Sequence, residues 1–213
     1  MHNWVDVILV LVLLANLILL GSSRLVIYIR VIAFQSLILG VLPTLLHAEQ
    51  LSRVLFLALM SGVLKGIVLP LVLLYVFKAV KVYREIEPFV GYGFSLVLGA
   101  TVFALSFWLG YRLPIVTPVA TPLMLPTALS TIFIGLFLIV SRKKAFTQIL
   151  GYLTFENGIY ILGIALVGDV PAIVELGVLL DLFVAVLIMA VATHRINRQF
   201  EHVDAEKLDF LKG

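Results

Sequence analysis

Long apolar runs separated by short polar linkers fill this chain almost from end to end, and they constrain its fold more than any other feature. Hydrophobic residues make up 62% of the 213 residues and charged residues only 13%, whereas a soluble domain carries about 25% charged residues. An apolar run of roughly 20 residues can cross a bilayer as a helix, which satisfies its own backbone hydrogen bonds. The sequence therefore predicts an all-α, polytopic membrane helix bundle.

Seven transmembrane helices are predicted, at residues 4–20, 25–46, 54–77, 89–110, 121–140, 145–167 and 172–193. Four prolines between residues 114 and 126 predict that the fifth helix begins late or is kinked. No soluble linker or internal repeat divides the chain, so we expect one integral membrane domain at 1–213. Within it we distinguish a five-helix part at 1–144, a helix pair at 145–196 and a polar tail at 197–213.

The basic residues predict how the helices are oriented in the membrane. With seven spans, twelve of the 15 Lys and Arg residues fall on one side and two, Arg53 and Arg112, on the other. The remaining one, Lys65, lies within a span. Because cytoplasmic loops carry the excess of positive charge, we expect the N-terminus outside, the tail in the cytoplasm, and a multi-pass protein of the inner (cytoplasmic) cell membrane.

Four ionisable residues lie inside the predicted spans: Lys65, Glu156, Glu175 and Asp181. A charge at the bilayer centre costs about 2.5–3.5 kcal/mol on insertion scales, so such residues usually face protein or water and often mark ion routes. At a rise of 1.5 Å per residue, Lys65 and Glu156 lie roughly 16 Å along their spans and Asp181 about 14 Å. All three are thus near the midplane, while Glu175 lies only about 5 Å from a helix end.

The midplane carboxyl groups have two interpretations. They could hold the bundle together as neutral acids hydrogen-bonded to a neighbouring helix. Alternatively, Glu156 and Asp181 could relay protons, with Lys65 as the counter-charge and Asn157 as a polar neighbour of Glu156. The sequence leaves Glu175 open between a capping or interfacial role and membership of the ion path.

Proline and glycine residues beside the charged positions also have more than one interpretation. Pro70 removes the backbone hydrogen bond to the carbonyl of Gly66, and small residues at 62 and 66 permit close helix approach. Together they could open a bent, hydrated segment beside Lys65, or they could serve tight packing. Gly151 and Gly158 form a small-residue stripe that predicts close contact with another helix.

Several chemistries are excluded by what the sequence lacks. There is no cysteine for a thiolate nucleophile or an iron–sulfur cluster. His47 and His194 are predicted at opposite ends of the bundle, which excludes a paired haem site. No phosphate-binding loop, GxSxG or HExxH motif is present. We therefore expect no cofactor, no nucleic-acid partner and no autonomous enzyme activity.

The C-terminal third resembles a known family. The run GYLTFENGIYILG and the following DVPAIVELGVLLDLFVAVLIMAVATHRINRQFEHVD are similar to component E of hydrogenase-4 and formate hydrogenlyase complexes. The helix pair at 145–196 looks like the K-type subunit of respiratory complex I and the C-type subunit of multisubunit cation/proton antiporters. The stretch LKGIVLPLVL around Lys65 and Pro70 shares this likeness.

This resemblance implies a non-catalytic membrane-arm subunit of a complex I-like, energy-converting assembly. Its partners would be antiporter-like membrane subunits and peripheral nickel–iron and iron–sulfur subunits. The first K-type carboxylate corresponds to Glu156; the second corresponds to Asp181 or to Glu175, with Asp181 departing from the Glu of the K-type pattern. Two other functions stay open from the residues alone: a purely architectural subunit and a free-standing small ion transporter.

Overall fold

The computed structural model describes residues 2–22, 24–46, 62–79, 91–113, 121–142 and 145–166, together with Gly177 and Ile188. Every element within this part of the chain is a helix. The elements are α1 (His2–Gly21), α2 (Leu25–Leu46), η2 (Leu64–Val68), α4 (Leu69–Ala79), α5 (Tyr92–Arg112), α6 (Met124–Ser141) and α7 (Ala145–Leu166).

Five of these helices, α1, α2, α5, α6 and α7, are long and apolar enough to cross a membrane. The described residues are therefore all-helical, as predicted, and their length and composition support a membrane helix bundle. The predicted third span is described from residue 62 on, as η2 and α4, and its earlier residues lie outside the described part. Of the predicted seventh span only Gly177 and Ile188 are described, and both are helical. The count of seven and the orientation in the membrane stay predictions.

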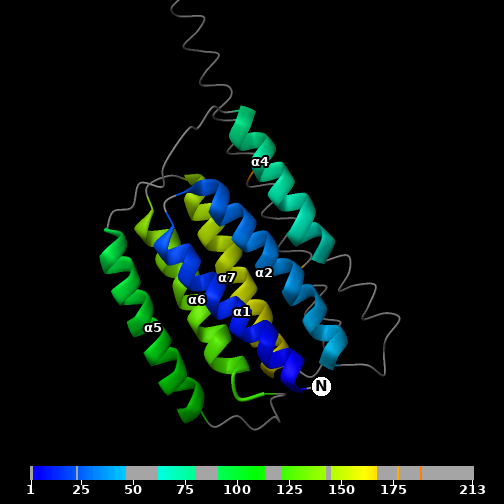
Figure 1. Ribbon diagram of the computed structural model, residues 1–213, viewed down its shortest axis with the longest axis vertical. Helices are drawn as coiled ribbons and strands as arrows, with labels where there is room; N and C mark the ends of the chain where they lie inside the picture. Colours follow the sequence, from blue (N-terminus) through cyan, green and yellow to red (C-terminus); the bar gives the residue numbers. More distant parts are fainter. Residues whose placement is uncertain are drawn as a thin grey trace, which may run out of the picture.

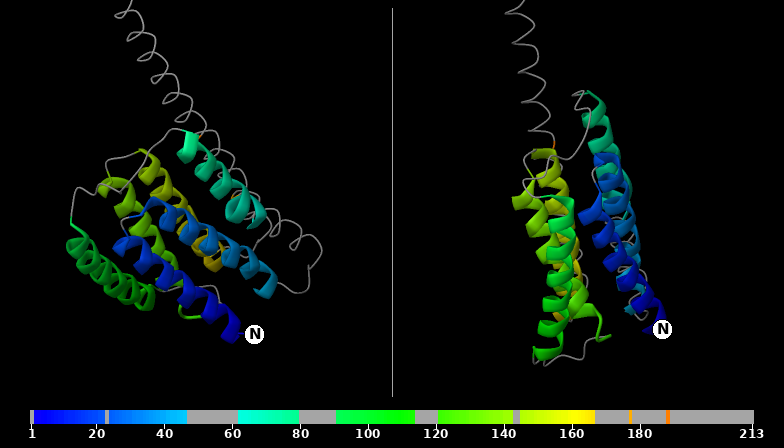
Figure 2. Two further views of the ribbon diagram at one scale, coloured as in Figure 1. Left: turned by 45° about the horizontal axis from the view of Figure 1, so that its top comes forward. Right: turned by 60° about the vertical axis from the view of Figure 1, so that its left-hand side comes forward.

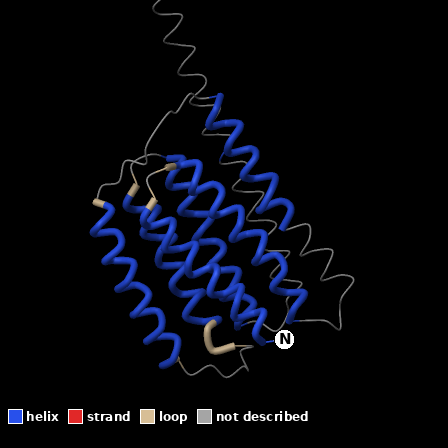
Figure 3. The backbone as a smooth tube through the Cα atoms, in the orientation of Figure 1, coloured by secondary structure: helices blue, strands red, loops and turns tan. Residues whose placement is uncertain are grey.

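The helices form two layers, which are seen edge-on in the right-hand view of Figure 2. One layer holds α1, α2 and α4, and the other holds α5, α6 and α7. Contacts between α1 and α6 and between α2 and α7 join the layers. The labels in Figure 1, read together with the tube drawn in the same orientation in Figure 3, show that α1 and α2 meet at the same end of the bundle as α6 and α7. The end marked N lies at the opposite end (Figure 1).

Glycines set the close approach of α6 and α7. A Cβ added to Gly158 would lie 2.6 Å from the Ile132 backbone nitrogen, and one added to Gly151 would lie 2.8 Å from the nitrogen of Ile139. On α6, a Cβ added to Gly135 would overlap the backbone of Phe155 on α7. Larger side chains would push the two helices apart. The predicted stripe at Gly151 and Gly158 is therefore confirmed as a helix contact, with α6 as its partner.

The proline-rich segment delays the start of α6, as predicted. The helix begins at Met124 rather than at residue 121, and Pro126 lies in its first turn. A proline is tolerated there because the first backbone N–H groups of a helix have no intrahelical acceptor. Gly110 of α5 packs against this turn, since a Cβ added to it would lie 2.6 Å from the Pro126 ring.

Arg142 corrects one assumption behind the charge count, which treated it as an ordinary linker residue. It lies at the expected end of the bundle, after α6, but is fully buried. Its Nη2 donates a 3.0 Å hydrogen bond to the Tyr28 hydroxyl oxygen, and its guanidinium carbon lies 6.0 Å from the Tyr28 ring centre. Arg142 thus ties the end of α6 to the first turns of α2.

Candidate functional site

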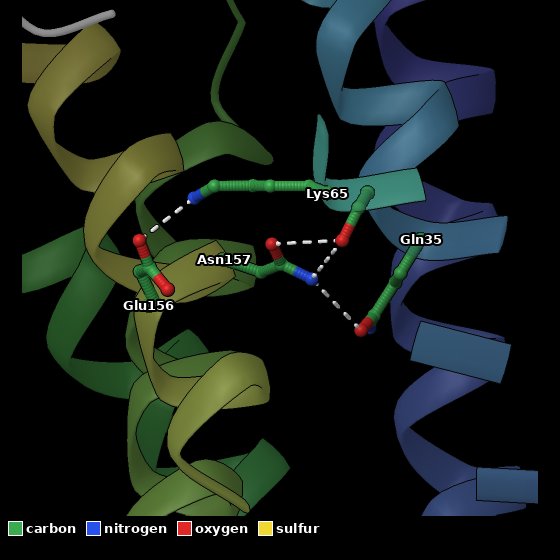
Figure 4. Close-up of polar contacts among 5 residues, drawn as sticks. Gln35, Lys65, Glu156 and Asn157 are labelled. Atoms are coloured by element: carbon green, nitrogen blue, oxygen red, sulfur yellow. Dashed lines mark hydrogen bonds and ion pairs between the residues drawn. The ribbon is translucent and has the colours of Figure 1, made fainter. Parts of the chain in front are cut away.

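Two of the predicted midplane charges form a buried ion pair. Lys65 of η2 and Glu156 of α7 approach across the boundary between the two layers, with 2.9 Å between Lys65 Nζ and Glu156 Oε1 (Figure 4). Their exposed fractions are 7% and 2%. The distance between the two groups therefore allows Lys65 to act as the counter-charge of Glu156.

The helix that carries Lys65 is widened at this point. The backbone N–H of Leu69 donates to the carbonyl of Leu64, five residues back, so residues 64–68 form a π-turn. Pro70 lies two residues after this turn. In a regular α-helix its ring would clash with the carbonyl of Gly66, four residues earlier, and it has no N–H to donate to that carbonyl. Single π-turns inside helices occur frequently at functional sites.

Gly66 shows that this widened turn is also tightly packed. A Cβ added to Gly66 would overlap the Leu37 side chain of α2. Of the two interpretations offered for this segment, tight packing therefore describes the side facing α2. Lys65 leaves the turn toward α7 instead (Figure 4).

The ammonium group of Lys65 has further neighbours. Its Nζ lies 5.7 Å from the centre of the Tyr160 ring, a distance at which a cation is attracted to an aromatic face. A Cβ added to Gly177 would lie 4.0 Å from the same Nζ and 3.8 Å from a ring carbon of Tyr160. Helical Gly177 thus brings its backbone beside the ion pair. Glu175 and Asp181 lie outside the described residues.

The two carboxyl oxygens of Glu156 differ. Oε1 accepts the hydrogen bond from Lys65, whereas Oε2 is buried and has no hydrogen-bond partner within the described part of the chain. A buried polar atom without a partner requires an explanation, such as a catalytic role or a water. Chemically, Oε2 is an open acceptor for a proton or a water molecule next to a fixed positive charge.

Asn157, the next residue of α7, begins a second polar arrangement. Its Nδ2 lies 3.5 Å from Gln35 Oε1 of α2, and its amide is within 3.2–3.3 Å of the hydroxyl of Ser36 (Figure 4). Gln35 Nε2 in turn donates to Asn16 Oδ1 of α1 at 2.8 Å. Asn16 Nδ2 donates to Thr131 Oγ1 of α6, also at 2.8 Å.

From Asn157 through Gln35 and Asn16 to Thr131, each amide group donates to the next residue, so this amide network crosses α7, α2, α1 and α6. The Ser36 hydroxyl donates in the opposite direction, to Asn157 Oδ1. The network ends where the Thr131 hydroxyl donates to the carbonyl of Thr127. Amide side chains donate and accept hydrogen bonds but do not titrate. The network therefore holds helices in register beside Glu156.

Asn16, Gln35 and Ser36 were not predicted, because the search for polar partners began from the ionisable residues in the spans. A signal was available, since Asn16 and Gln35 are amides inside the mostly apolar helices α1 and α2. Such residues hydrogen-bond across helices in a membrane. Among the described residues no three His, Asp or Glu side chains gather closely enough to hold a metal ion.

Known bacterial proteins are similar to this chain in sequence. The chain is 30% identical over 201 residues to the uncharacterized protein Rv0085 of Mycobacterium tuberculosis, covering 93% of this chain and 91% of that protein. It is 35% identical over 80 residues to Hydrogenase-4 component E of Escherichia coli and of Shigella flexneri. That alignment spans 38% of this chain and 37% of component E, so the resemblance found in the sequence is supported over part of the chain.

No protein-family model matches the chain, and no solved structure matches it. The alignment to Rv0085 covers nearly the whole of both proteins at 30% identity. The chain therefore belongs to the same family as the mycobacterial protein Rv0085.

Proposed function

We propose that this chain is a non-catalytic membrane subunit of a hydrogenase-type complex and that Lys65, Glu156 and Asp181 form part of its proton path. The partial similarity to Hydrogenase-4 component E and the apolar helices support membership of such a complex. Its partners in this proposal are antiporter-like membrane subunits and peripheral nickel–iron and iron–sulfur subunits. The assembly lies in the inner membrane with the tail of this chain in the cytoplasm.

The observation that carries the proposal is the buried Lys65–Glu156 pair with one open carboxylate oxygen. While Glu156 is ionised, its attraction to the ammonium group of Lys65 offsets the cost of burying both charges. A proton arriving at Oε2 neutralises the carboxyl group and removes that attraction. Lys65 then interacts more favourably with another carboxylate, and its return beside Glu156 favours release of the proton, because a nearby positive charge stabilises the ionised carboxylate. The pair can in this way couple proton occupancy to a small movement of one lysine.

Asp181 is the second carboxylate in this proposal. Gly177 lies beside Lys65, and on a regular helix a residue four positions later is rotated by only about 40° and lies one turn along. Asp181 would then share the face that Gly177 turns toward Lys65. Glu175, two positions before Gly177, would be rotated by about 160° and point away. We assign Glu175 to the helix end, in a capping or interfacial role.

Three conservative variants test the proposal: Glu156→Gln, Asp181→Asn and, as the matched control, Glu175→Gln. Each removes a titratable group and keeps nearly the same shape. The assembled complex is purified in mild detergent, reconstituted into vesicles, and assayed for electron transfer and for proton translocation per electron. We expect the first two variants to assemble and to lose proton translocation, while the control retains it.

Two results would instead favour an architectural subunit or a free-standing transporter. Full proton coupling in assembled Glu156→Gln and Asp181→Asn complexes would contradict the path and favour an architectural role. Proton or sodium flux through the purified chain alone, in a functional homo-oligomer that does not co-elute with redox subunits, would instead favour a free-standing transporter.

A further inference from the structure

Arg30 is a positive charge on the outer surface of α2 that the proton path does not use. It lies five residues after Leu25, roughly 7.5 Å along the helix from its start, and it is exposed. No hydrogen bond or ion pair joins its guanidinium group to the part of the chain that the structure describes. An arginine at this depth is costly in hydrocarbon unless its side chain reaches water or an anion.

A groove between α1 and α2 begins at this arginine. Its volume is about 320 Å³. Among the described residues that line it, Arg30 is the charged one and the others are apolar, including Leu11, Leu14 and Ile18 of α1 and Phe34 of α2. Leu14 and Ile18 are each 51% exposed, and Phe34 is 46% exposed. The groove is therefore open along the outer face of the bundle, where lipid surrounds a membrane protein.

The charge of the groove favours a lipid over a neighbouring helix. A helix would need a carboxylate within the membrane to complement Arg30, which is costly, whereas a phospholipid carries its anion in the headgroup. Arg30 supplies a planar set of donors that matches phosphate oxygens in pairs. It also lies toward the end where α1 meets α2, which the charge pattern predicts to face the anionic cytoplasmic leaflet.

We infer that this groove binds one phospholipid with an anionic headgroup. The acyl chain lies along Leu14, Ile18 and Phe34, and the phosphate accepts hydrogen bonds from Arg30. Neutral, zwitterionic lipids would also place a chain in the groove, but they lack the net negative charge that complements an unpaired guanidinium. The selectivity of the site therefore depends on Arg30. This inference is independent of the proton path.

Tryptophan fluorescence tests the inference in the full-length chain. The two native tryptophans are replaced (Trp4→Phe and Trp108→Phe), and Phe34→Trp places a reporter in the groove. The protein is reconstituted into phosphatidylcholine vesicles that contain brominated phosphatidylglycerol or, at the same mole fraction, brominated phosphatidylcholine. Bromine quenches tryptophan on contact, so the ratio of the two quenching constants measures the preference for the anionic lipid at this position.

We expect brominated phosphatidylglycerol to bind about fivefold more strongly, the factor expected for one basic residue near an anionic headgroup, and this preference to decrease at high salt. Arg30→Gln should abolish the preference, and Arg30→Lys should retain much of it. Arg112→Gln, at an exposed arginine beside Trp108 on α5, should leave it unchanged. Equal quenching by both lipids, or a preference that survives Arg30→Gln, would overturn the inference. Absence of quenching by either lipid would also overturn it.

Discussion

The substitution Lys65→Met should destabilise the bundle by more than the loss of one contact. It removes the 2.9 Å ion pair to Glu156 and the approach of Nζ to the Tyr160 ring, and leaves a carboxyl group that is 2% exposed. Breaking a buried pair by removing one partner costs about 3–5 kcal/mol, because the other charge is left uncompensated. A lost cation–π contact adds about 0.5–2 kcal/mol. We expect the free energy of unfolding to decrease by about 3.5–7 kcal/mol.

The double variant Lys65→Met/Glu156→Leu measures the interaction energy between the two side chains. Replacing both buried charges by apolar side chains of similar size is often neutral or even stabilising. The double variant should therefore be more stable than either single variant. The interaction energy from the double-mutant cycle should reach about 3 kcal/mol, at the upper end of the values found for residues in contact.

The assay is equilibrium unfolding in mixed micelles of dodecyl maltoside and sodium dodecyl sulfate, followed by the helical circular dichroism signal. Arg24→Gln serves as the control, since it removes an exposed charge and should change the free energy of unfolding by no more than about 0.5 kcal/mol. If the losses of the two single variants simply add in the double variant, Lys65 and Glu156 do not interact and the reasoning is refuted.

Two further substitutions test the packing and the amide network. Gly158→Ala should lower the free energy of unfolding by about 1–3 kcal/mol because α6 leaves no space for a Cβ. Gly93→Ala, where nothing lies within 4 Å, should instead raise the free energy of unfolding by about 0.5–1 kcal/mol. Equal effects of the two substitutions would contradict the contact between Gly158 and α6. Gln35→Leu removes one hydrogen bond from Asn16 Oδ1 and one from Asn157 Nδ2 and should cost about 1–3 kcal/mol in the same assay. The assembled complex should nevertheless keep proton translocation, and its loss would place the network on the path.

The helix positions could be predicted well because membrane insertion depends on the length of apolar runs. The predicted span at residues 25–46 coincides with α2, and that at 145–167 ends one residue beyond α7. The late start of α6 followed from the prolines before Pro126, which restrict the backbone in a known way. These features depend on local sequence and on the thickness of the bilayer, and both can be read without knowing how the helices pack.

The contacts between helices were predictable only in part. Depth arithmetic placed Lys65 and Glu156 at the same level, and a charge at that level requires a partner. Which faces meet depends on the rotation of each helix, and the π-turn at 64–68 changes that rotation without any signal in hydropathy. For the same reason the link from Gln35 to Asn16 was not predicted. The burial of Arg142 was missed because a charge count treats every linker residue alike.

The protonation state of Glu156 during turnover tests the proposed proton path. Infrared difference spectra of the reconstituted complex, with and without its electron donor, detect the carbonyl stretch of a protonated carboxyl group and its shift in D₂O. We expect a band that changes on turnover in the native complex and disappears in Glu156→Gln while the complex remains assembled. Identical carboxyl spectra for the two complexes would contradict the proposed path, because Glu156 would then exchange no proton while the enzyme works.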